Sequence, residues 1–230
     1  MAEVFARLRG PSIIGFSIYL VFEAGEAAIG PDISLLRDIL DGIRDVLLVP
    51  FDIAIYRLLI LGEVTSRYSF ALNTRLQRIA GSTIVLWSFN NIPLHVLSLV
   101  TSSDLIKAIA IFAAMVAGIA VAVRIAIFFP AIASDARGAT IGSAPADTRG
   151  QVWFILKAFL IVFLPQLMVT IALAGLASLG VVGDVSDPSM WSALPQVMLI
   201  GTIGFLTQAA SAVIASLLFD WIGDRVKGAP

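Results

Sequence analysis

The chain of 230 residues is 59% hydrophobic and only 13% charged, and its formal net charge is −1. This composition excludes an ordinary soluble domain and is typical of a membrane protein with several spans and short loops. Cysteine is absent, which excludes disulfides, thiolate metal sites and cysteine nucleophiles.

Six apolar segments follow one another along the chain, separated by short polar stretches. A helix rises 1.5 Å per residue, so about 20 apolar residues cross a hydrocarbon core of roughly 30 Å. The expected spans are residues 11–29, 46–62, 79–100, 104–130, 152–180 and 190–222. We therefore predict an all-α fold, a six-span transmembrane helical bundle that forms one integral membrane domain over residues 1–230, and we expect the first segment to be retained as a span.

Residues 33–45, between the first two spans, have the pattern of an amphipathic helix. Leu36, Leu40 and Ile43 recur at helical spacing, and the other face is charged. We interpret this segment as interfacial or protruding first turns of the second span. A docking surface for an external partner, or one wall of a vestibule, is the alternative.

The basic residues predict the orientation of these spans. Only three of the fifteen basic residues, Arg37, Arg44 and Lys107, fall on the side opposite to the N-terminus. Because basic residues gather in cytoplasmic loops, this partition predicts that both termini are cytoplasmic. The cytoplasmic arginines also suit anionic lipid headgroups.

Ionisable residues inside a span cost about 2.5–3.5 kcal/mol on insertion scales, so each one needs a polar partner or water. Asp52 lies inside the second span, shortly after Pro50, and Arg57 is a poor partner on the same helix because it is five residues away. We expect Asp52 to contact Arg124 of another helix, Arg57, or the amides at positions 90 and 91.

Other polar residues at membrane depth extend this prediction to a layer near the bilayer centre, which Gln166 and Gln208 would join. The predicted network consists of Asp52, Arg57, Arg124, Asn90, Asn91, Glu23 and Glu26. Hydrogen-bonded structural roles and contacts with a solute or ion both remain open for these residues. His95, the single histidine, is interpreted as a satisfied polar residue.

The fourth span carries small residues at every fourth position, which predicts a helix-packing face. These residues are Ala110, Ala114, Gly118 and Ala122. Small side chains let another helix approach closely, either within the bundle or in a homo-oligomer.

Three short motifs carry a resemblance to a known group of proteins. They are residues 49–63, residues 124–135, and the Asp-Thr-Arg-Gly run at 147–150. Together they resemble uncharacterised bacterial six-helix inner-membrane proteins that look related to the membrane domain of glycerophosphodiester phosphodiesterases. The resemblance implies a multi-pass protein of the bacterial inner membrane. The phosphodiesterase chemistry of those relatives belongs to a separate soluble domain, which these residues do not include.

No enzyme motif is present in the sequence. It contains no phosphate-binding glycine loop, no His-Glu-x-x-His motif and no nucleophile elbow. We expect no catalytic residue, no cofactor, no metal site and no nucleic-acid partner.

Two functions remain as hypotheses. The first is a non-enzymatic scaffold or accessory subunit that associates with membrane lipids, with other membrane proteins or with copies of itself. The alternative is a transporter or channel for a small solute or ion that uses the polar layer. A transporter requires a cavity that reaches Asp52, whereas a scaffold requires a dry interior.

Overall fold

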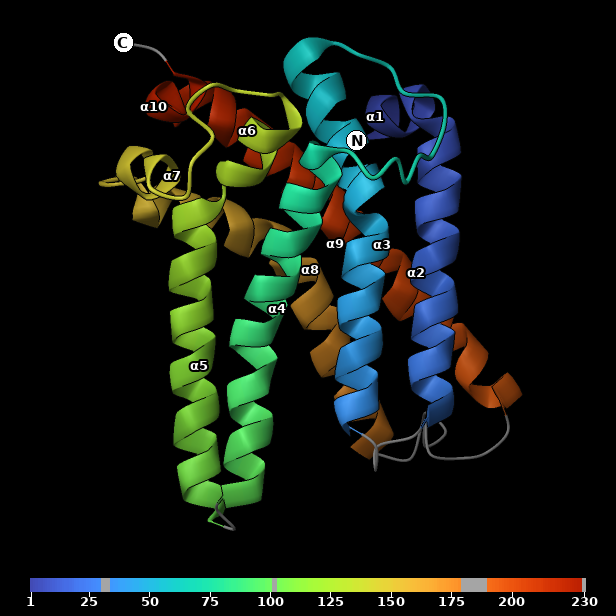
Figure 1. Ribbon diagram of the computed structural model, residues 1–230. Helices are drawn as coiled ribbons and strands as arrows, with labels where there is room; N and C mark the ends of the chain where they lie inside the picture. The colour runs from blue at the N-terminus through green and yellow to red at the C-terminus, as the bar shows by residue number, and fades with distance from the viewer. Residues whose placement is uncertain (30–33, 101–102, 179–189, 229–230) are drawn as a thin grey trace.

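The computed structural model describes residues 1–29, 34–100, 103–178 and 190–228, and these residues form helices and loops. Six long helices run up and down the molecule (Figure 1). Their bounds are α2 (Arg9–Ile29), α3 (Ser34–Leu61), α4 (Thr74–Val100), α5 (Asp104–Ile125), α8 (Val152–Ser178) and α9 (Met190–Ile222). The shorter helices are α1 (Ala2–Arg7), α6 (Phe128–Ala133), α7 (Ser143–Asp147) and α10 (Asp224–Lys227).

Among the described residues, four segments are long and apolar enough to cross a membrane. They are Arg9–Ile29, Ala108–Ala133, Val152–Leu173 and Leu194–Ile222. Helices α3 and α4 are as long, with 28 and 27 residues, but they carry more polar side chains. The described part of the chain is therefore all-α and contains four helices that could cross a bilayer.

Two boundaries differ from the sequence prediction. The amphipathic segment and the second span form one continuous helix, α3. The expected span at 104–130 is divided, because α5 ends at Ile125 and α6 begins at Phe128. Pro130 explains the break: it has no N–H for the carbonyl of Ala126, and its ring would clash with that carbonyl in a continuous helix.

The two ends of the bundle differ in charge. One end holds α1, α6, α7, α10 and the loop at 62–73 (Figure 1), and most of the arginines of the chain lie in or next to these segments. We call it the basic end. The opposite end, where α2 ends and α3 begins, we call the acidic end.

The apolar core lies nearer the basic end. Phe51 of α3 stacks on Phe205 of α9, with ring centroids 4.9 Å apart. In α4, α5 and α8, the buried apolar residues that the structure describes are Leu76, Ile79, Val123 and Ile155, all in the turns closest to the basic end. Beyond these turns, the described apolar residues of the three helices are half-buried or exposed.

Helices α2 and α9 pack closely at Gly201 and Gly204. A Cβ atom at Gly201 would lie 2.7 Å from Cδ2 of Leu20, and one at Gly204 would collide with the ring of Tyr19. The predicted packing face on α5 is less covered. Ala110, Ala114 and Gly118 are half-buried and Ala122 is exposed.

Candidate functional site

A cavity of about 320 Å³ lies between α3, α4, α6 and α9. Its polar side chains include Asp45 and Asp52 from α3, Asn91 from α4 and Gln208 from α9. The remaining lining residues are Tyr56, Ile79, Thr83, Leu86, Trp87 and Phe129. We call this space the Asp52 cavity.

Asp52 is the most buried acid in the wall of this cavity. Its side chain belongs to a residue that is only 9% exposed. Oδ2 accepts a hydrogen bond of 2.8 Å from Nε2 of Gln208 on α9. Oδ1 is buried and has no hydrogen-bond partner in the described structure. A buried carboxylate oxygen without a partner is costly, so this atom needs water, a proton or a bound cation.

The two arginines expected at Asp52 lie elsewhere. Arg57 donates to Glu63 at 2.8 Å and to the carbonyl of Ala133 at 3.0 Å, both at the basic end. Five residues turn a helix by about 140°, so Arg57 and Asp52 point to different sides of α3. The prediction that Arg57 or Arg124 pairs with Asp52 was wrong. The Asp52 carboxylate accepts a hydrogen bond from the side-chain amide of Gln208 instead.

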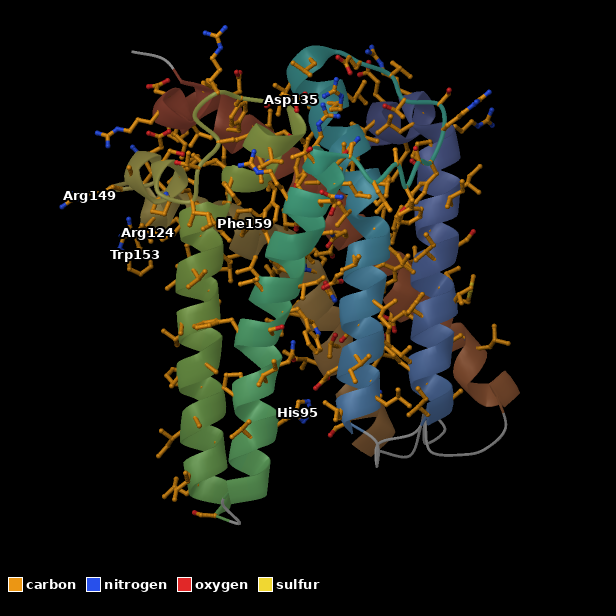
Figure 2. The ribbon with its side chains drawn as sticks, viewed as in Figure 1. His95, Arg124, Asp135, Arg149, Trp153 and Phe159 are labelled. Atoms are coloured by element: carbon orange, nitrogen blue, oxygen red, sulfur yellow. The ribbon has the colours of Figure 1, made fainter. Side chains whose placement is uncertain are left out.

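Arg124 lies at the basic end of α5, on the side away from α3 (Figure 2). Its Nη1 donates to the carbonyl of Pro145 at 3.3 Å, and its own carbonyl accepts from the hydroxyl of Thr148 at 3.2 Å. Arg124 therefore fastens α7 to the end of α5 and takes no part in the Asp52 cavity.

Helix α4 forms the opposite wall of the cavity, and several of its side chains make polar contacts. Asn91 lines the cavity and donates from Nδ2 to the carbonyl of Trp87 at 3.0 Å. Nε1 of Trp87 donates to the carbonyl of Asp38 at 2.9 Å, and Nε2 of His95 lies 2.6 Å from the Asp38 carboxylate. Figure 2 shows His95 directed from α4 toward α3. The side chain of Asn90 is outside the described residues.

A second polar group, which we call the Arg44 cluster, adjoins the cavity toward the acidic end. Glu23 and Glu26 of α2 accept from Nη1 of Arg44 at 3.1 and 3.3 Å. Asp41 also pairs with this guanidinium, and Asp45 lies 3.9 Å from Nε. The ring of Tyr19 lies under the guanidinium, 4.5 Å from it. Asp45 belongs both to this cluster and to the cavity wall.

Sequence reasoning identified the two glutamates but missed their partner. Arg44 belongs to the charged face of the amphipathic segment, yet its side chain is only 12% exposed. The available signal was the glutamate pair itself, since two acids on one helical face require a cation at the same depth.

The predicted network therefore divides into separate groups. Glu23 and Glu26 join Arg44, while Asp52 and Asn91 share the cavity with Gln208. Gln166 is not among the cavity-lining residues.

Arg57 belongs to an ion-pair group at the basic end. Asp135 lies 3.4 Å from Nη1 of Arg57 and also pairs with Arg75. The hydrogen bonds from Arg75, assisted by the charges of both arginines, lower the pKa of Asp135. This group ties α3, the start of α4 and the end of α6 together.

The described residues contain no group of three or more His, Cys, Asp or Glu side chains placed to hold a metal ion. Comparisons of the chain with family models, curated proteins and solved structures found no match. The geometry of the Asp52 cavity therefore carries the functional argument.

Proposed function

We propose that this chain is a multi-pass transporter that moves a small polar solute across the bacterial inner membrane, and that the Asp52 cavity is its binding site. The single observation that carries this proposal is the buried, unpartnered oxygen of Asp52 in the wall of a 320 Å³ cavity. A protein that only scaffolds others has no need of an uncompensated carboxylate oxygen at this depth.

The proposed topology has six spans with both termini in the cytoplasm. Helices α3 and α4 serve as the two more polar spans because their polar faces meet each other and line the cavity. The basic end then lies on the cytoplasmic side and the acidic end faces outward, in agreement with the positive-inside rule.

Water access to the cavity is the first test of the proposal. The chain contains no cysteine, so single cysteines can be introduced one at a time. In liposomes, Thr83→Cys and Asn91→Cys should react with a small impermeant thiol reagent. Ile161→Cys is the control, because this exposed residue of α8 should face lipid and stay unreactive. Unreactive cysteines at both cavity positions would contradict a water-filled pathway.

A scaffold remains the second candidate, and the outward faces of α5 and α8 favour it. Phe112 of α5 and Trp153 of α8 are 63% and 73% exposed, and further large apolar residues extend these faces. Such surfaces suit either lipid or a partner membrane protein.

The two candidates predict opposite rankings of two variants. For a transporter, Asp52→Asn should abolish solute flux in liposomes, while Gly118→Leu should act only through stability. For a scaffold, Gly118→Leu should disturb assembly, and Asp52→Asn should leave assembly and host-complex activity nearly intact. Flux and assembly are measured on both variants, with Glu3→Gln, an exposed residue of α1, as the control. Retained flux in Asp52→Asn would reject the transporter.

A further inference from the structure

The acids around the Asp52 cavity outnumber the available cations. The cavity and the Arg44 cluster together contain five carboxylates: Glu23, Glu26, Asp41, Asp45 and Asp52. Among the described residues, Arg44 is the cation in ion-pair contact with them. Arg37 adds one more positive charge that acts on Glu23 from a greater distance. Five acids therefore face two cations, so carboxyl groups remain available to pair with a cationic solute.

Two of these acids lie on the same side of α3. Asp45 and Asp52 are seven residues apart, so they are two turns apart and about 10 Å apart along the helix axis. Both line the cavity. Two ammonium groups joined by four or five methylenes are roughly 6–8 Å apart when the chain is extended. With a charge-assisted hydrogen bond of about 2.8 Å at each end, such a molecule reaches both carboxylates.

The lining of the cavity suits a hydrocarbon chain with cationic ends. Tyr56 and Trp87 supply aromatic rings, which attract ammonium groups, and Leu86 supplies an aliphatic surface. A cavity of about 320 Å³ holds a diamine of six or seven heavy atoms together with several waters. A bare metal ion fits less well, because the described acids and His95 do not form a group that could hold one.

We propose that the solute of the Asp52 cavity is a linear aliphatic diamine, bound as a dication with one ammonium at the Asp52 carboxyl group and the other at Asp45. This inference rests on the proposed transport function and names its substrate class.

Binding to the full-length protein in detergent tests this inference, with radiolabelled 1,4-diaminobutane as the probe and n-butylamine as the matched monoamine competitor. The diamine should bind at least tenfold more tightly than the monoamine. Asp45→Asn should remove this advantage and leave butylamine binding unchanged. Asp52→Asn should weaken both amines at least tenfold. Asp220→Asn, an exposed acid at the basic end of α9, is the control and should change neither affinity.

Equal affinities for the two amines in the unaltered protein, or a diamine advantage that survives Asp45→Asn, would overturn the inference. If Asp52→Asn fails to fold, the Asp45→Asn comparison decides alone. Failure of this inference is distinguishable from failure of the transport proposal. If neither amine binds but Thr83→Cys and Asn91→Cys react from water and another solute shows Asp52-dependent flux, the diamine is wrong and transport stands.

Discussion

Gly204 links helix packing to the Arg44 cluster. A Cβ atom at this position would lie 2.6 Å from Cζ of Tyr19, which is closer than real Cβ atoms approach. The same tyrosine ring lies under the guanidinium of Arg44. The absence of a side chain on α9 therefore sets the position of the ring, and the ring in turn helps to position the guanidinium between its acids.

Gly204→Ala should consequently destabilise the protein. Overpacking at a buried site costs about 1–3 kcal/mol, and the displaced ring would also weaken its contact with Arg44. Gly81→Ala in α4 is the matched control, because a Cβ there meets nothing within 4 Å. It should be neutral or stabilise the helix by roughly 0.5–1 kcal/mol. The free energy of unfolding of both variants is measured in detergent micelles. Equal stabilities would show that the Tyr19 ring moves aside without a loss of stability.

Residue chemistry allowed the polar positions to be predicted, but it did not identify their partners. Asp52, Glu23 and Glu26 were recognisable because acids inside apolar segments need compensation. Their partners depend on how separate helices rotate and slide against each other, which no spacing within one helix determines. Gln208 lies 156 residues from Asp52, and only the packing of α9 against α3 brings the two together.

At the scale of elements, the basic end is assembled by docking α10 onto the loop that follows α6. A Cβ at Gly138 would meet the carbonyl oxygen of Val226 at 2.8 Å and would collide with that of Arg225. The backbone N–H of Val226 donates to Asp147 of α7 at 2.9 Å. The C-terminal helix is therefore held by backbone contacts that leave no room for a side chain.

Gly138→Ala should release α10 from this loop. Because backbone atoms cannot move aside as a flexible side chain does, we expect a loss of about 1–3 kcal/mol and faster cleavage by trypsin at Arg225 or Lys227. Gly142→Ala in the same loop has open space around the added methyl and should leave cleavage unchanged. Identical cleavage rates in the two variants would contradict this account of α10 docking.

The extent of the long helices was largely predictable from the run lengths of apolar residues. The expected span at 190–222 and the helix α9 coincide, and the expected end of the first span at residue 29 is the end of α2. The break between α5 and α6 was not predicted, because composition remains apolar through Phe128 and Phe129 and only the backbone chemistry of Pro130 interrupts the helix.

At the scale of the whole molecule, the position of the terminal helices supports the proposed orientation. The first and last helices, α1 and α10, lie at the basic end (Figure 1), together with the loop at 62–73 and helices α6 and α7. The antiparallel course of the six long helices brings the arginine-rich segments together at one end. The molecule therefore has two ends of different chemistry.

Single-cysteine labelling in intact cells tests this orientation. Phe70→Cys and Ile141→Cys, both exposed positions at the basic end, should be protected from an impermeant reagent added outside. Ser103→Cys, next to the start of α5 at the opposite end, should react. Labelling of position 70 or 141 from outside would reverse the proposed topology.

The uneven anchoring of α4 and α5 has a consequence for the lipid environment. Their buried apolar residues lie near the basic end, and farther along, α4 is held to α3 by the polar contacts of Trp87 and His95. A helix pair whose buried apolar contacts lie mainly at one end adjusts its tilt to the thickness of the surrounding hydrocarbon more easily than a pair buried along its whole length. Since Thr83, Trp87 and Asn91 of α4 form one wall of the Asp52 cavity, acyl-chain length would set the width of that cavity. If the cavity binds a solute as proposed, lipid composition would change the affinity for that solute.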